Sequence, residues 1–199
     1  VREMLKIARN LQLSLIGAFW LGDSFALGIE RDSNGNTAKF ESMASNQGRL
    51  LDSGVLLGDE FSGYRTAIAN AMTDESMLGE SGLRTLSSAH HSYRPGGYHT
   101  GSSWPFDGVL TARGLLKNGF TRESKMVQAK IKNAIESCGG YPEFFRGDWP
   151  ETDLINRFIH DVQIVDERGV HSHTNRVAQP PQIIQGWTVA AYSWLADKA

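Results

Sequence analysis

The sequence predicts a single, mainly helical domain that carries one small β-hairpin. Its 199 residues can bury an ordinary core, and their hydrophobic content of 40% is typical of globular domains. Apolar residues recur at the spacing of one helix face along most of the chain, whereas one short segment has the pattern of paired strands. Helices are expected at residues 1–18, 47–56, 59–73, 105–119 and 121–139, with a sixth beginning near Pro181.

The N-terminal part combines an amphipathic helix, the hairpin and two further helices. The apolar face of the first helix consists of Met4, Ala8, Leu11 and Leu15. The hairpin is expected from residues 25–31 and 37–40, because Asn34-Gly35 can supply the positive φ angles of a tight turn. The helix at 59–73 presents an apolar face made of Phe61, Tyr64, Ile68, Ala71 and Met72.

The C-terminal part contains the remaining helices and one long connection. Pro105 suits the first position of a helix, Thr121 is expected to cap the next one, and Gly139-Gly140 to end it. Residues 141–180 are polar and are expected to be irregular. The last helix is expected to bury Ile183, Ile184, Trp187, Ala191 and Trp194.

Charge and composition narrow the possible partners. A net charge of −2 gives no field that would attract nucleic acid or an anionic membrane, so a neutral ligand is favoured. No apolar run approaches the roughly 20 residues that cross a bilayer. A lone cysteine and the absence of a signal-like N-terminus indicate a cytoplasmic protein. Cys138 falls on the apolar stripe of its helix, which favours a buried side chain over a reactive thiol.

No cofactor or metal is expected. The chain lacks the glycine-rich motifs that bind nucleotide phosphates, and it lacks a Gly-x-Ser-x-Gly nucleophile elbow. Four side chains offer metal-ligand chemistry, but without the helix-borne spacing of zinc sites: His160, Asp161, His171 and His173.

The segment from Ser92 to Asp107 has the composition of a sugar site. It reads Ser-Tyr-Arg-Pro-Gly-Gly-Tyr-His-Thr-Gly-Ser-Ser-Trp-Pro-Phe-Asp and leads directly into a helix. Sugar rings place C–H faces on aromatic side chains and need hydrogen-bonding groups around their hydroxyl edges. Tyr98 and Trp104 are therefore candidate stacking platforms, and His99 is a candidate hydroxyl contact, with core packing as the alternative for each.

Four collinear motifs resemble the C-terminal half of glycogen-debranching amylo-alpha-1,6-glucosidases. Tyr98–Asp107 is similar to that family's Tyr-His-x-Gly-Ser-Val-Trp-Pro-His-Asp, and Ser45–Gly54 to its Ser-Asn-x-Gly-His-Leu-Leu-x-Ser-Gly. Gly140–Phe145 resembles its Leu-Pro-Glu-Leu, and Gln185–Ala190 its Gln-Ala-Trp helix. The sequence departs from the usual residues at Arg49, Phe106 and Gly108.

The resemblance implies a fold, an activity and site residues. The fold is an (α/α)6 toroid, of which residues 1–199 would be the C-terminal half as one domain, with the other half missing or on another chain. The activity is inverting hydrolysis of α-linked glucosides, with Glu143 as the general base and the general acid outside this segment. Asp107 would line the sugar site, where the alternative is an anion that stabilises a helix N-terminus. Gln185 and Trp187 complete the expected binding residues.

Two other classes of function stay open. Without a general acid, the chain could bind carbohydrate without catalysis; alternatively, the same toroid could carry a sugar epimerase or isomerase. A half-toroid would also expose apolar helix faces, so self-association is expected in the absence of the other half.

Overall fold

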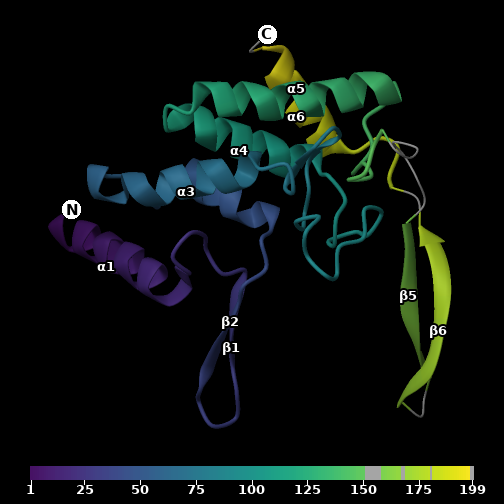
Figure 1. The fold of residues 1–199 in the computed structure, drawn as a ribbon, viewed down its shortest axis with the longest axis horizontal. Coiled ribbons are helices and arrows are strands. Elements are labelled where there is room, and N and C mark those ends of the chain that lie inside the picture. The colour runs from purple at the N-terminus through teal and green to yellow at the C-terminus, as the bar shows by residue number, and fades with distance from the viewer. Residues whose placement is uncertain (151–157, 167–168, 180, 198–199) are drawn as a thin grey trace.

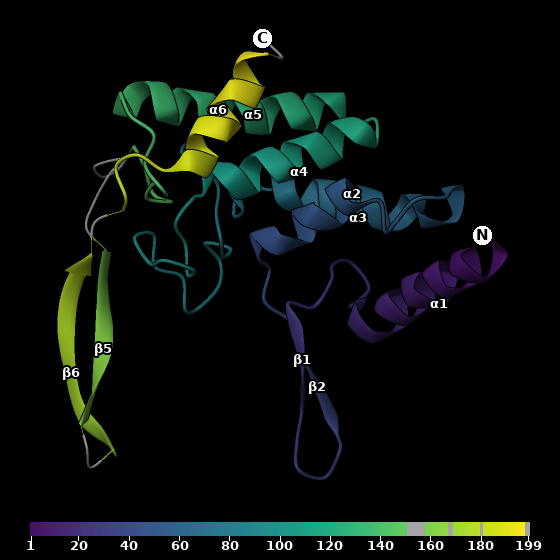
Figure 2. The same ribbon diagram turned by 180° about the vertical axis from the view of Figure 1, so that it is seen from behind.

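The computed structural model describes residues 1–150, 158–166, 169–179 and 181–197. Helices dominate, as the sequence predicts; α1 lies at one edge of the helical part, and α5 lies at the opposite edge, where α6 crosses it (Figures 1 and 2). Two long hairpins and the loop before α4 extend from the same side of this helical part. The helices are α1 (Arg2–Phe19), α2 (Gly48–Ser53), α3 (Ser62–Thr73), α4 (Pro105–Lys117), α5 (Thr121–Cys138) and α6 (Gly186–Ala196).

Helix α4 lies at the centre of the core, in contact with α2, α5 and α6. Pro105 occupies its first turn, as predicted, and Val109, Ala112 and Leu115 are buried. Helices α2 and α4 approach closely because each carries a glycine at the contact. A Cβ atom on Gly114 would lie 2.6 Å from the backbone nitrogen of Asp52, and one on Gly48 would collide with the Thr111 side chain.

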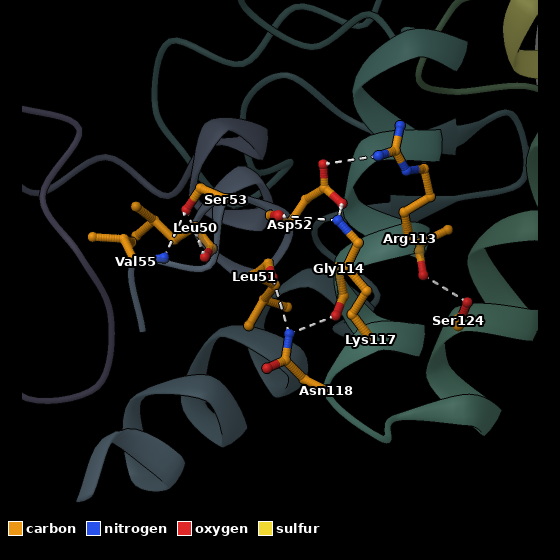
Figure 3. A network of polar contacts seen from close by, with 11 residues as sticks. Leu50, Leu51, Asp52, Ser53, Val55, Arg113, Gly114, Lys117, Asn118 and Ser124 are labelled. Carbon is orange, nitrogen blue, oxygen red and sulfur yellow. Dashed lines mark hydrogen bonds and ion pairs between the residues drawn. The ribbon is translucent and has the colours of Figure 1, made fainter. Parts of the chain in front are cut away.

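Polar contacts fasten the C-terminal ends of α2 and α4 to each other (Figure 3). Lys117 Nζ lies 2.6 Å from Asp52 Oδ1, and Arg113 Nη2 lies 3.6 Å from Asp52 Oδ2. Asn118 Nδ2 donates to the carbonyls of Leu51 and Gly114, at 2.9 and 2.7 Å. Because Arg49 near the start of α2 pairs with Asp107 near the start of α4, whereas Leu51 and Asp52 meet residues 113–118, the two helices run in the same general direction.

Helix α5 packs antiparallel to α4 through its predicted apolar stripe. Val127, Ile131, Ala134 and Ile135 are buried, and burial raises the pKa of the Cys138 thiol. Gly139 ends the helix in the left-handed conformation, with φ of 67°, as predicted. The prediction for Thr121 was wrong, since this residue is the first in the helix and Phe120 precedes it without a side-chain cap.

The first hairpin forms where it was predicted, but with a different turn. Strands β1 (Gly28–Arg31) and β2 (Thr37–Phe40) pair antiparallel, and β1 is shorter than the expected 25–31. Only Gly35 of the Asn34-Gly35 pair has a positive φ, of 83°. Asp32 Oδ1 organises the turn instead, by accepting the amides of Asn34 and Asn36 at 2.9 and 2.8 Å.

The expectation that residues 141–180 are irregular was wrong over much of its length. Strands β5 (Phe158–Asp166) and β6 (Gly169–Gln179) form a second antiparallel hairpin, with a register shift between Gln163 and Val165. This segment contains several β-branched residues, which favour strands, among them Val162, Val165, Val170 and Val177. The polarity of the segment led to the expectation of an irregular connection. A two-residue pair, β3 (Leu78–Gly79) with β4 (Gly82–Leu83), was also not predicted. The side chains of His160, Asp161, His171 and His173 lie outside the described residues.

The apolar face of the first helix and part of the apolar surface of the last helix are uncovered. No residue of α1 is buried, and Met4 and Leu11 are exposed. The apolar side chains that pack against the core are Leu15, Ile16 and Phe19 near its C-terminal end, and the Arg9 guanidinium lies 4.7 Å from the Phe61 ring centroid. Helix α6 begins at Gly186 instead of Pro181, and the predicted burial of Ile183, Ile184 and Trp187 was wrong because all three are exposed. Ala191 is buried as predicted, and Trp194 is partly buried against the core; Thr188 and Leu195, which were not predicted, are buried as well.

Candidate functional site

The backbone around Glu143 is held on one side by the segment that leads into α6. The Glu143 amide donates to the Gln182 carbonyl at 2.8 Å, and the Gln185 amide donates to the Tyr141 carbonyl at 2.8 Å. The buried Thr188 hydroxyl donates to the Pro142 carbonyl at 2.8 Å. These bonds tie Glu143 to the start of α6, although about 40 residues separate the two segments in the chain.

The other side of this segment pairs with the loop that precedes α4. Ser103 and Phe145 exchange two backbone hydrogen bonds, of 2.9 and 2.8 Å. Arg84 forms a bridge with Ser103, and its side chain donates to the carbonyls of Gly147 and Glu75 at 2.8 and 2.7 Å. Arg84 therefore holds the segment around Phe145 against the loop before α4.

An aromatic cluster fills the space between these two connections. Trp104 is at its centre: its ring lies 4.8 Å from Tyr98, 5.6 Å from Phe144 and 6.3 Å from Trp187, measured between ring centroids. Phe106 extends the cluster, stacking on Trp187 at 5.4 Å. We call Tyr98, Trp104, Phe106, Phe144 and Trp187 the aromatic cluster.

Glu143 joins the aromatic cluster through Tyr98. The Tyr98 hydroxyl donates to Glu143 Oε1 at 2.6 Å. Burial, the hydrogen bond to Glu143 and the negative charge of that carboxylate together raise the pKa of Tyr98 to about 12. The phenol is therefore protonated at neutral pH and donates a fixed hydrogen bond, which orients the carboxylate.

The two tryptophans of the cluster differ in what they are bound to. The Trp104 indole N–H donates to the Tyr98 carbonyl at 3.1 Å and to the Ser102 hydroxyl at 2.9 Å, so this side chain holds the loop together. Trp187 is 42% exposed and offers the more open ring. The predicted stacking role therefore suits Trp187 better than Trp104, whose contacts are mainly internal.

Asp107 lies in the first turn of α4, beside the aromatic cluster. Its Oδ2 accepts the Ser45 hydroxyl at 2.9 Å, and its Oδ1 accepts Arg49 Nε at 3.0 Å and also Arg49 Nη2. The Arg49 guanidinium in turn lies 5.8 Å from the Phe106 ring centroid. Asp107 thus connects to the cluster through Arg49 and Phe106, and no contact between Asp107 and Glu143 is present among the described residues.

The remaining predicted site residues lie at the margins. His99 is exposed, and its ring is nearly parallel to that of Trp104 at 5.8 Å. The Gln185 side chain caps α6, with Oε1 accepting the Gly186 amide at 2.9 Å, and its Nε2 donates to Gln182 Oε1 at 2.8 Å. The structure therefore gives Gln185 a local capping role next to Glu143.

Sequence reasoning did not assign four residues that shape this site: Ser45, Arg49, Phe106 and Phe144. Two of them carry a visible signal, because Arg49 and Phe106 are positions at which the debranching-enzyme motifs have histidine. Phe144 follows the candidate base directly, and Ser45 opens the motif that contains Arg49. Their contacts with Asp107 and the cluster depend on tertiary packing between segments that are far apart in the chain, which the sequence pattern does not specify.

Within the described parts of the chain, acidic, histidine and cysteine side chains do not gather in groups of three or more that could hold a metal ion. The helices there are also too short or too polar to cross a membrane.

Comparison with known proteins identifies the fold through solved structures alone. No family model and no curated protein matches the chain. A GH63 mannosylglycerate hydrolase from Thermus thermophilus, solved with Tris, aligns at a TM-score of 0.59 and 14% identity over 94% of this chain and 36% of its own. The same enzyme solved with glucose aligns at 0.54 and 14% identity, over 81% and 31%.

An uncharacterized conserved protein from the same organism aligns at a TM-score of 0.58 and 13% identity, over 94% of this chain and 38% of its own. The chain therefore spans about a third of the length of these solved structures. At such low identity the likeness concerns the fold: the chain has the helical architecture of part of a GH63 glycosidase structure.

Proposed function

We propose that the chain is the C-terminal part of an (α/α)6-barrel glycoside hydrolase that cleaves α-linked glucosides with inversion, as amylo-alpha-1,6-glucosidases do. The observation that carries the proposal is the 2.6 Å hydrogen bond from Tyr98 to Glu143, at the edge of an aromatic cluster. The fold shared with part of a glycosidase supports it, as do the four motifs that resemble the debranching family.

Glu143 is the general base in this proposal. An inverting glycosidase needs one carboxylic acid to protonate the leaving oxygen and one carboxylate to take a proton from the attacking water, on the opposite face of the sugar. Tyr98 orients Oε1 of Glu143, which leaves Oε2 to accept the water proton. The water oxygen then bonds to the anomeric carbon as the glycosidic bond breaks.

The general acid belongs to the part of the barrel that precedes these residues. The two carboxyl groups of an inverting site stand about 6.5–9.5 Å apart. The other carboxylate beside the cluster, the partly buried Asp107, is engaged by Ser45 and Arg49, which suits sugar binding better than proton donation. Tyr98, His99, Trp104, Gln185 and Trp187 complete the proposed binding surface, with Trp187 as its most open ring.

The uncovered faces of α1 and α6 fit the same proposal, because they are the surfaces that the rest of a barrel would cover. Met4, Leu5 and Leu11 on one helix and Trp187 and Val189 on the other are exposed apolar side chains. Large apolar surfaces drive association. We therefore expect residues 1–199 alone to self-associate and to lack catalytic activity.

The intact protein, assayed on α-linked malto-oligosaccharides, tests the reaction. NMR of the first product formed should show the β-anomer of glucose; an initial α-anomer would contradict inversion. Mannosylglycerate, the substrate named for the fold neighbour, belongs in the same panel. Free sugar that changes configuration without hydrolysis would instead support an epimerase. Binding of oligosaccharide without turnover by the intact protein would support a carbohydrate-binding role.

A further inference from the structure

Two departures from the debranching-enzyme motifs touch each other in the fold. Arg49 stands where the motif has histidine, and so does Phe106, although they lie on separate helices, α2 and α4. The Arg49 guanidinium carbon lies 5.8 Å from the centroid of the Phe106 ring. Together they connect Asp107, which Arg49 binds, to Trp187, on which Phe106 stacks.

The geometry of Arg49 leaves one edge of its guanidinium available. The Nε and Nη2 groups donate to Asp107, and the side chain is 51% exposed. Among residues 1–150 and 181–197, no hydrogen bond to or from Arg49 Nη1 is present. A guanidinium held at one edge by a carboxylate and on one face by an aromatic ring is fixed in orientation, so its other N–H groups are directed donors.

The net charge of the Arg49–Asp107 pair favours an uncharged ligand group as the acceptor of the Arg49 hydrogen bond. Asp107 is only 14% exposed and pairs with Arg49, so the two side chains together carry no net charge. An incoming carboxylate would gain little from Arg49, because Asp107 would repel it at nearly the same distance. A neutral hydroxyl suffers no such repulsion and can accept from Arg49. Its ring can lie on the exposed Trp187, one phenylalanine ring away.

We propose that Arg49 is a specificity-determining contact for an uncharged sugar, donating to a hydroxyl of a ring that lies on Trp187. The assignment rests on the proposed glycosidase function. It adds that the preferred ligand is uncharged and that Arg49 recognises it. Phe106 acts as the positioning residue, because it supports both Arg49 and Trp187.

Calorimetric titration of the intact protein with maltose and with its oxidised, anionic counterpart maltobionate tests the proposal. Arg49→Lys keeps the charge but loses the planar fork and the stacking on Phe106, so maltose affinity should fall about tenfold, as expected for a lost directed hydrogen bond. The wild-type protein should prefer maltose to maltobionate. The matched control is Arg113→Lys, since Arg113 also joins α2 to α4 but pairs with Asp52 away from the aromatic cluster; its maltose affinity should not change.

The outcomes distinguish a failure of the Arg49 assignment from a failure of the proposed glycosidase function. Wild-type binding of maltose that survives unchanged in Arg49→Lys would overturn the role of Arg49 and leave the glycosidase proposal standing. Stronger binding of maltobionate than of maltose would also overturn it. If the wild-type protein binds neither sugar, the proposed function fails and this assignment fails with it. Thermal melts verify folding, and Arg49→His, which restores the residue of the motif, gives a second variant expected to lose affinity.

Discussion

The two ends of the α2–α4 helix pair hold similar carboxylates in different surroundings. Asp52 and Asp107 are 17% and 14% exposed, and each pairs with a cation from the opposite helix. Around Asp52, the partners are Lys117 and Arg113, and Asn118 binds neighbouring carbonyls (Figure 3). Around Asp107, the pair borders the aromatic cluster.

This difference shows that a partly buried, paired carboxylate does not by itself identify a binding site. The Asp52 end consists of contacts between the two helices, beside Gly114, whose missing side chain lets them approach closely. The Asp107 end has the same kind of ion pair, but its arginine rests on an aromatic ring and remains half exposed. Aromatic surroundings and an available donor, not the charge pair, distinguish the end at which we propose sugar binding.

Among the substitutions in and around the aromatic cluster, Glu143→Gln should lower turnover most. Removing a general base typically lowers the rate by about 10²–10⁴-fold, and the amide is nearly isosteric, so folding should be preserved. Turnover of the intact protein on malto-oligosaccharides measures the effect. Asp52→Asn is the control at the other end, with expected loss of thermal stability but normal turnover. Activity above about a tenth of wild type in Glu143→Gln would show that another residue is the base.

At the Asp52 end of the helix pair, a substitution should lower the stability of the fold by disturbing the packing of α2 on α4. Gly114→Ala places a Cβ atom 2.6 Å from the backbone of Asp52 and from Leu51 Cβ, so the helices must separate. Forcing extra volume into a packed contact costs about 1–3 kcal/mol, which thermal or urea unfolding can detect. Gly63→Ala on α3 meets no atom within 4 Å and should change stability by less than about 1 kcal/mol. Equal melting curves for the two variants would contradict the close helix contact.

The two tryptophans of the cluster allow a finer comparison. Trp187→Ala should weaken oligosaccharide binding by about 1 kcal/mol or more, since ring stacking contributes that much beyond area burial. The fold should tolerate it because the ring is largely open. Trp104→Ala should lower the melting temperature more, because the indole binds the Tyr98 carbonyl and the Ser102 hydroxyl. Titration calorimetry and thermal melts distinguish the two; a reversed pattern would exchange their roles.

Local signals in the sequence were sufficient to predict the helices. The stripe of α5, the Pro105 start of α4 and the Gly139 stop follow from residue types at fixed spacing, and all three are present. Long-range features were not accessible in this way. The spacing of Met4 and Leu11 predicts an amphipathic helix but cannot say what covers it, and Ile183 and Ile184 precede α6 because backbone pairing with residues 141–143 keeps them extended.

The candidate site shows the same difference between local signals, which the sequence carries, and long-range contacts, which it does not. Tyr98, Trp104 and Glu143 were selected by residue type and motif, and the fold brings them into one cluster. Their partners Phe106, Phe144 and Arg49 were missed as site residues, since an apolar ring or an arginine gains its meaning from what it touches. The contact between Arg49 and Phe106 joins two helices that are separated in the chain by α3 and a long loop.

The smallest expected effect concerns the proton of Tyr98. Its pKa is raised to about 12 by burial first, and then by the hydrogen bond and the negative charge of Glu143. Glu143→Gln removes the charge and leaves the burial, so the pKa should fall but stay above its ordinary value of 10.0. The tyrosinate absorbance, followed against pH and corrected with Tyr98→Phe, measures this change. Glu136→Gln is the control, since Glu136 accepts from Tyr192 at 3.2 Å and should leave Tyr98 unchanged.

The same shift predicts how stability depends on pH at the alkaline end. Because the folded state holds the Tyr98 proton more tightly than the unfolded chain, its contribution is complete below pH 10 and is lost as the pH rises toward 12. In Glu143→Gln, the pH range over which Tyr98 loses its contribution to stability should be narrower, because the folded-state pKa of Tyr98 moves toward that of the unfolded chain. Urea unfolding at a series of alkaline pH values detects the difference. If wild type and Glu143→Gln lost stability in parallel and their tyrosine titrations coincided, Glu143 would not be the acceptor that holds Tyr98, and the hydrogen bond on which the proposed base assignment rests would be absent in solution.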